Sequence, residues 1–149
     1  MKLKIKALSP KIGTEIPFPY YASGGAAAMD LHACLDQPLV LGAGERATVP
    51  TGIAIALPGP EYVALVFARS GLAVKEGVCL SNGVGVIDSD YRGEIRVGLL
   101  NTGREDYAIQ PGARVAQLAV VPVVQAQLER VDALDETSRG AGGFGSTGK

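Results

Sequence analysis

Two aspartates and a tyrosine follow a glycine-rich segment near the middle of the chain. Residues 82–101 read NGVGVIDSDYRGEIRVGLLN, with Asp88, Asp90 and Tyr91 between the glycines and an alternating apolar run. Glycine backbone followed by an aromatic ring can form a narrow slot for a planar base and its sugar. An aspartate beside that slot can accept a proton from water. The alternative is an acidic hairpin turn, because Asp and Gly are favoured in turns.

A second candidate follows an apolar run. Residues 67–73 read FARSGLA, so Arg69, Ser70 and Gly71 come directly after a predicted strand. They offer a guanidinium fork, a hydroxyl and a closely approachable backbone, which suit phosphate oxygens. A strand-end turn with a solvated arginine explains the same residues equally well.

The C-terminal residues change character at Thr137. From there the chain is mostly Gly, Ser and Thr, with Arg139 and Phe144 set among glycines. Such a segment cannot bury enough apolar surface to order itself, so a frayed tail is one interpretation. Arginine and phenylalanine are costly choices for a solubility tail, and glycines let backbone N–H groups approach phosphate. Residues 143–149, GFGSTGK, imitate a Walker motif, but no strand pattern precedes them.

Three polar residues have structural explanations that are favoured when each is taken alone. Asp30 lies in AAMDLHA (27–33), where it could serve as a turn or capping residue. Gln117 interrupts the apolar run RVAQLAVV (114–121) and is typical of a satisfied buried amide. His32 is the single histidine, so a protein metal site built on it is improbable, and we interpret it as structural.

The elements that must position these residues are strands. Apolar residues alternate with polar ones at Leu3, Ile5 and Ala7, and again at Ile95, Val97 and Leu99. Further strands are predicted at 51–57, 62–67 and 115–124, and a short helix at 71–76. Turn signals lie between them at 41–44, 58–60, 81–83 and 110–112. Many short strands without a long helix predict an all-β sandwich or barrel.

The bulk composition describes a single ordinary domain. The chain has 149 residues, 47% hydrophobic and 19% charged, with a net charge of −1. That charge gives no general attraction to nucleic acid or to an acidic membrane surface. The N-terminal residues lack a signal-peptide pattern, and Cys34 and Cys79 suggest reduced thiols, so we expect a cytoplasmic protein.

Taken together, the segments resemble the trimeric dUTPase family of the bacterial type. Five family motifs occur in order: AAMDLHA, ARSGLA, NGVGVIDSDYRGEI, RVAQLAV and RGAGGFGSTG. The third and fifth are long and specific, and the resemblance covers nearly the whole chain. The first motif departs from the family, which usually has Gly and Arg where this chain has Ala27 and His32.

The resemblance implies a jelly-roll-like antiparallel β-barrel that assembles as a homotrimer. Residues 1–136 would form the single domain, and 137–149 a flexible arm that closes over a neighbouring active site. The family hydrolyses dUTP to dUMP and pyrophosphate, which keeps uracil out of DNA and supplies dUMP for thymidylate synthesis. Mg²⁺ would be held mainly by the triphosphate and water, with Asp30 in its outer shell.

Carried onto this chain, the resemblance makes Asp88 the general base that deprotonates the water attacking the α-phosphorus. Asp90 receives no catalytic role. Tyr91 would pack against deoxyribose and exclude a ribose 2′-hydroxyl. Asn82 and the backbone near Val86 and Ile87 would read the uracil edge.

The phosphates would be held by Arg69, Ser70, Gly71 and Gln117. From the arm, Phe144 would stack on uracil and Arg139 would act as an arginine finger. The full set of expected substrate-binding residues is Arg69, Ser70, Gly71, Asn82, Val86, Ile87, Asp88, Tyr91, Arg96, Gln117, Arg139, Phe144, Gly145 and Ser146.

Two other functions fit parts of the pattern. A dCTP deaminase shares the fold but acts on cytosine N4. A non-catalytic trimeric jelly-roll could bind nucleotides without turning them over. The segment GVIDSDY and the phenylalanine in the arm favour the phosphatase over both alternatives.

Overall fold

The computed structural model describes residues 1–143, which form eleven strands and one short helix. The predicted strands at 51–57, 62–67 and 115–124 and the predicted helix are confirmed, as are both alternating runs. The elements are β1 (Lys4–Ala7), β2 (Met29–His32), β3 (Leu39–Leu41), β4 (Arg46–Pro50), β5 (Ile53–Ala56), β6 (Tyr62–Phe67), α1 (Ser70–Glu76), β7 (Val78–Leu80), β8 (Gly85–Ile87), β9 (Arg96–Asn101), β10 (Tyr107–Ile109) and β11 (Arg114–Pro122).

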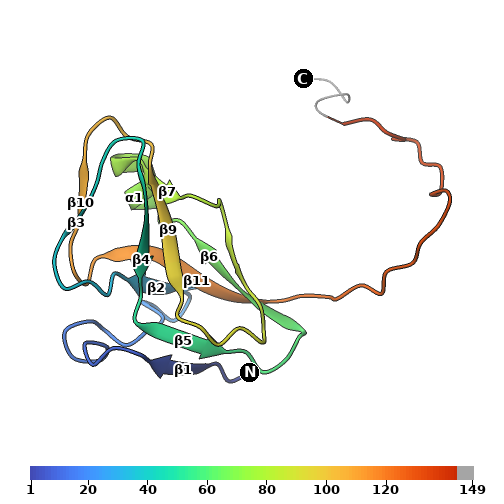
Figure 1. The fold of residues 1–149 in the computed structure, drawn as a ribbon. Helices are drawn as coiled ribbons and strands as arrows, with labels where there is room; N and C mark the ends of the chain where they lie inside the picture. Colours follow the sequence, from blue (N-terminus) through green and yellow to red (C-terminus); the bar gives the residue numbers. More distant parts are fainter. Residues whose placement is uncertain (144–149) are drawn as a thin grey trace.

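The strands pair antiparallel in four sheets (Figure 1). The largest has the order β2-β11-β6-β8, and a three-stranded sheet has the order β4-β9-β7. Two further pairs, β1-β5 and β10-β3, complete the arrangement. The prediction of an all-β, antiparallel fold is therefore confirmed. Within residues 1–143 these hydrogen-bonded ladders stay separate and do not close into one continuous barrel.

One apolar core joins the four sheets. Alternation in β9 buries Val97 and Leu99 and leaves Arg96 on the exposed face. Each sheet contributes side chains to the same cluster. A strand that slipped by one residue would turn its apolar set toward solvent, so the core fixes the register of the strands that carry the site.

A β-bulge interrupts the pairing of β11 with β2. Arg114 lies opposite His32, but the next pair along is Ala116 with Leu31, which leaves Val115 as an extra residue. Val115 and Ala116 are both buried, although neighbouring residues in a regular strand face opposite sides. Unbroken alternation would have pointed the side chain of Arg114 into the core. The bulge therefore turns it to the opposite face of the sheet.

Asn101 is a buried polar residue at the end of β9. Its amide nitrogen donates to the carbonyls of Leu41 at 2.9 Å and Glu105 at 2.8 Å. Its oxygen accepts from the Gly103 amide at 2.8 Å. Because the hydrogen bonds of the amide are satisfied, burial is not penalised, and the side chain fixes the turn toward β10.

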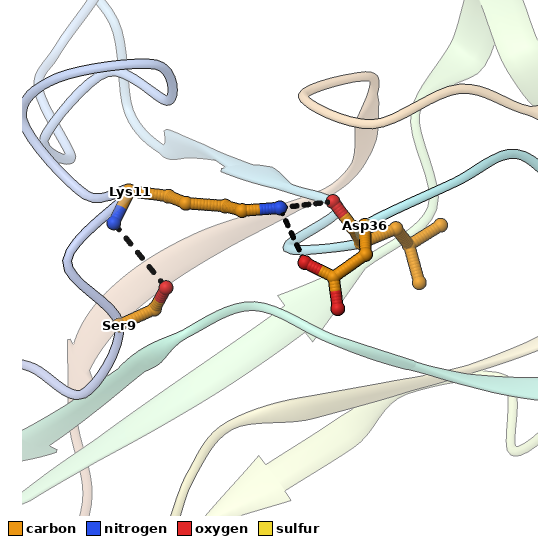
Figure 2. Close-up of polar contacts among 4 residues, drawn as sticks. Ser9, Lys11 and Asp36 are labelled. Carbon is orange, nitrogen blue, oxygen red and sulfur yellow. Dashed lines mark hydrogen bonds and ion pairs between the residues drawn. The ribbon is translucent and has the colours of Figure 1, made fainter.

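An exposed ion pair fastens the N-terminal loop (Figure 2). The Lys11 ammonium contacts Asp36 Oδ1 at 2.6 Å and donates to the Leu35 carbonyl at 3.0 Å. The Lys11 backbone amide also donates to the Ser9 hydroxyl at 3.3 Å. The hydrogen bond and the opposite charge raise the pKa of Lys11 and lower the pKa of Asp36.

The chain leaves the sheets after β11. Residues 123–143 run away from the strands as an extended segment, orange to red in Figure 1. Apolar side chains in it are exposed, including Leu128 at 94% and Leu134 at 87%. Among residues 1–143, α1 is the sole helix, and it is too short to cross a membrane.

Candidate active site

A cavity of about 270 Å³ opens beside β8 and the start of β9. That volume is slightly below the range of roughly 300–1,000 Å³ typical of pockets for drug-sized ligands. It contains six of the residues expected from the sequence. Its lining is Val66, Leu80, Asn82, Gly85, Val86, Ile87, Asp88, Tyr91, Glu94, Ile95, Arg96, Val97 and Gly98.

The cavity lining includes two carboxylates, one with a hydrogen-bond partner and one without a partner among residues 1–143. Glu94 Oε1 accepts the backbone N–H of Gly52 at 2.9 Å, so this carboxylate fastens the cavity wall to the turn between β4 and β5. The Thr51 hydroxyl reinforces the same wall by donating to the Ile95 carbonyl at 2.6 Å. Asp88 is exposed, and within residues 1–143 its carboxylate has no hydrogen bond or cation partner. Of the two, Asp88 is therefore the one available to water.

Tyr91 forms the rim of the cavity. Its hydroxyl donates to the Glu94 carbonyl at 3.0 Å, which folds the ring back over the turn. Arg92 braces this turn by donating to the carbonyls of Ser89 at 2.7 Å and Tyr91 at 2.9 Å. The ring is therefore held in one orientation at the mouth of the pocket.

A second polar group lies where β2, β6 and β11 meet. Asp30 pairs in register with Gln117, and Gln117 pairs in register with Phe67, so the three form one row across the sheet. Asp30 contacts Arg69 Nε at 2.9 Å and a terminal nitrogen of Arg114 at 3.2 Å. The sheet thus brings together side chains from three of the predicted motifs.

Gln117 is tied to the strand that precedes Arg69. Its Nε2 donates to the Ala68 carbonyl at 2.9 Å. Ser70 and Gly71 follow as the first residues of α1, and Arg69 is the N-cap residue without a side-chain capping bond. Gln117 therefore holds the backbone from which the Arg-Ser-Gly segment begins.

β6 connects the two groups. Its Val66 lines the cavity and pairs with Gly85 of β8, while the following Phe67 pairs with Gln117 of β11. The Asp30 and Arg69 group is not itself part of the cavity lining. One strand therefore carries a base-sized pocket on one side and leads into a cationic segment at its end.

His32 lies beside this cationic group. Burial lowers its pKa, the charge of Asp30 opposes that shift, and the charges of Arg114 and Arg69 add to it. The imidazole is therefore neutral over a wider pH range than that of an exposed histidine.

Of the residues expected from the C-terminal arm, the structure describes Arg139, which is not part of the cavity lining. Arg139 is on the extended segment, where its Nε donates to the Gly142 carbonyl at 2.9 Å. Phe144, Gly145 and Ser146 lie outside the described residues. This chain's own arm therefore does not bring Arg139 to its own cavity.

The donor set does not suit a metal ion held by protein side chains alone. Within residues 1–143 there is no group of three His, Cys, Asp or Glu side chains that could share an ion. Both oxygens of Asp30 already face arginines.

The sequence did not identify several residues that shape the site. Glu94, Gly98 and Leu80 line the cavity, and Arg114 joins the cationic group. Glu94 precedes an alternating apolar run, and nothing in that pattern indicates that its side chain lines a cavity. The position of Arg114 depends on a bulge, and no residue type in that run marks one.

The fold and the site define a class: an all-β, antiparallel protein with a cavity that contains the carboxylate of Asp88, and with a separate group of two arginines around Asp30. The dUTPase family model matches residues 14–148. The deoxyuridine 5′-triphosphate nucleotidohydrolase of Hahella chejuensis is 51% identical over 146 residues, covering 98% of this chain and 96% of the relative. That of Escherichia coli O45:K1 is 47% identical over 148 residues, covering 99% and 98%.

Solved structures give the same result. A mutant dUTPase of phage 80α superposes with a TM-score of 0.84 at 26% identity, covering 97% of this chain and 98% of the other. The Staphylococcus bacteriophage 80α dUTPase with dUPNHPP has a TM-score of 0.82 at 25% identity, covering 99% of both chains. This chain belongs to the dUTPase family.

Proposed function

We propose that the chain carries out the dUTPase reaction with Asp88 as its general base. As a member of the family it is a dUTP diphosphatase, which hydrolyses dUTP to dUMP and pyrophosphate. The assignment of Asp88 depends on one observation. Its carboxylate lies at the cavity and has no hydrogen-bond or ion-pair partner among residues 1–143, whereas the carboxylate of Glu94 accepts a hydrogen bond from the Gly52 amide. Asp88 takes a proton from the water that attacks the α-phosphorus.

The cavity supplies base and sugar selection. Asn82 and the backbone of Val86 and Ile87 read the uracil edge, with Arg96 at the pocket wall. A methyl group at C5 of the base would clash with a backbone slot, and cytosine would present the reversed donor and acceptor pattern. The ring of Tyr91 lies at the rim, where it packs on deoxyribose and leaves no room for a 2′-hydroxyl.

In the proposed assembly each site lies between subunits, so the phosphate chain of a nucleotide in one chain's cavity lies along the Arg-Ser-Gly segment of a neighbouring chain. Arg69, Ser70, Gly71 and Gln117 of that neighbour hold the phosphate oxygens, and Gln117 also donates to the Ala68 carbonyl at 2.9 Å. The substrate is the magnesium complex of dUTP, in which the ion balances phosphate charge. Fixed donors of this kind lower the barrier because charge builds up on the phosphate oxygens in the transition state.

We also propose a homotrimer of jelly-roll-like barrels in which residues 137–149 form an arm that closes over a neighbour's site. The support is the extended segment after β11, which exposes Leu128 and Leu134 and buries little against its own chain. A second copy would cover that surface. Arg139 would then reach the neighbour's phosphates, and Phe144, Gly145 and Ser146 would cover its base.

The deciding experiment is a panel of dUTP, dTTP, dCTP and UTP with magnesium, scored for pyrophosphate and ammonia. We expect pyrophosphate from dUTP alone. Ammonia from dCTP would favour the deaminase alternative, and binding without turnover would favour the non-catalytic one. The expected location is the cytoplasm, where the free thiols of Cys34 and Cys79 would stay reduced.

A further inference from the structure

One carboxylate joins two guanidinium groups beside the proposed phosphate site. Asp30 reaches Arg69 with one oxygen and Arg114 with the other, at 2.9 and 3.2 Å. The Asp30 side chain is 19% exposed and that of Arg69 27%, so their pairing is better shielded from solvent than a surface ion pair. Arg114 is 54% exposed, which leaves most of its donors accessible.

The bulge in β11 creates this group. The extra residue Val115 points into the core and turns Arg114 toward the face that carries Asp30. With regular alternation, Arg114 would share the core-facing side of Ala116. A local distortion that moves a charged side chain beside Asp30 is typical of a functional position.

The charges and contacts at this group suit a polyanion. Two guanidinium groups share a single carboxylate, which leaves a net positive charge at the ends of β2, β6 and β11. Arg69 contacts Asp30 through Nε, and among residues 1–143 no hydrogen bond engages its terminal nitrogens. Those nitrogens form the fork that binds phosphate oxygens in pairs.

We propose that Asp30 is a positioning residue that holds Arg69 and Arg114 as a two-arginine clamp, and that Arg114 is a further phosphate-binding residue. The inference rests on the proposed role of Arg69. It assigns Asp30 a function that needs no metal, since both of its oxygens are directed at cations.

The test measures binding of a non-hydrolysable imido analogue of dUTP and of deoxyuridine, each with magnesium and with EDTA. The variants are Asp30→Asn, Arg114→Gln and the double substitution. Each single variant should weaken analogue binding about tenfold, the scale of a lost charge-assisted hydrogen bond, in both conditions. Deoxyuridine binding should not change, and the double variant should lose less than the product of the single losses, because the residues act as one unit.

Two substitutions give matched controls. Asp36→Asn removes an ion-paired carboxylate in the N-terminal region, and Arg104→Gln removes an exposed arginine between β9 and β10. Neither should alter binding of the analogue. If Asp30→Asn does not fold, Arg114→Gln decides the matter, since the Arg114 side chain is largely exposed.

Three outcomes would overturn the clamp. A loss confined to magnesium-containing buffer would show that Asp30 acts through the ion. An equal loss for deoxyuridine would show a general distortion of the pocket. Unchanged analogue binding in Arg114→Gln would remove Arg114 from the site. The proposed function fails separately, if Arg69→Gln leaves analogue binding unchanged or if the wild-type chain does not hydrolyse dUTP.

Discussion

Tyr91 lies so close over Gly93 that a methyl group on the glycine would overlap the tyrosine hydroxyl and ring. The hydroxyl is fixed by its hydrogen bond to the Glu94 carbonyl at 3.0 Å. A hydrogen in place of a side chain at position 93 is therefore what allows the ring to fold over the turn. The rim of the cavity, where we propose that the sugar packs, depends on this pair.

Gly93→Ala should displace the Tyr91 ring and weaken the exclusion of ribose. The ratio of kcat/KM for dUTP over UTP should fall by about tenfold, the usual scale for steric selection in a pocket. Steady-state pyrophosphate release from both nucleotides measures it. Gly24→Ala is the control, because a Cβ there meets nothing within 4 Å. An unchanged ratio in Gly93→Ala would remove Tyr91 from sugar selection.

Asp88→Asn should lower kcat by about 10²–10⁴-fold, the contribution typical of a general base. Binding of an imido analogue of dUTP should persist, because the substitution preserves the shape of the side chain. Asp90→Asn, in the same turn, is the matched control and should retain kcat. Full turnover by Asp88→Asn would refute the mechanism.

The strands could be predicted from the sequence because the alternation of apolar and polar residues that forms them lies within a few neighbouring positions. Alternation at Ile95, Val97 and Leu99 is visible in the chain, and all three side chains are buried, Ile95 just before β9 and the other two within it. Asn101 shows the limit. Its buried amide is satisfied by carbonyls of residues 41 and 105, and the first of these lies 60 positions away in the chain. A hydrogen bond between residues this far apart in the chain depends on how the strands are arranged, and the alternation of apolar and polar residues does not predict that arrangement.

The sequence pointed to Asp88 and Tyr91 as candidates because the glycines and the acid lie together in one segment, and the structure places both at the same cavity. Their roles in the reaction stay a prediction. The grouping of Asp30 with Arg69 and Arg114 depends on strand order and on the bulge at Val115, both properties of the sheet. The proposed contribution of Arg139 would require a second chain, and the alternation of residues in one chain does not describe contacts between chains.

The neutral state of His32 predicts a stability that depends on pH. Burial lowers its pKa in the folded protein below the ordinary value of 6.5, so the unfolded chain binds the extra proton first. The free energy of unfolding should therefore fall as pH drops through 6.5 toward the folded pKa, and should level off above 6.5. Urea denaturation of wild type and His32→Gln over this interval measures the difference. Parallel curves for the two proteins would show that another group controls the slope.

The Lys11 and Asp36 pair predicts weaker effects at both pH extremes. The pKa of Asp36 is lowered, so its contribution is present above 3.8 and is lost as pH falls through the folded value. The pKa of Lys11 is raised, so its contribution is present below 10.5 and is lost as pH rises through the folded value. Because Asp36 is 95% exposed, screening should weaken the pair. Asp36→Asn should lower the thermal midpoint slightly at low salt and not at high salt. An equal decrease in both buffers would mean that the pair is not what fastens the loop.

Two truncations separate the arm from the segment that precedes it. Removing residues from Ser138 onward should leave a folded trimer with little activity, because Arg139 is lost; a finger arginine contributes roughly 10³–10⁵ in rate in related phosphoryl-transfer enzymes. Removing residues from Val123 onward should also weaken assembly, since the exposed side chains of Leu128 and Leu134 are then missing. Sedimentation and dUTP turnover are measured on both. Dissociation of the protein that lacks residues from Ser138 onward would place the assembly contacts in the arm itself. Full activity of the same protein would show that Arg139 is dispensable.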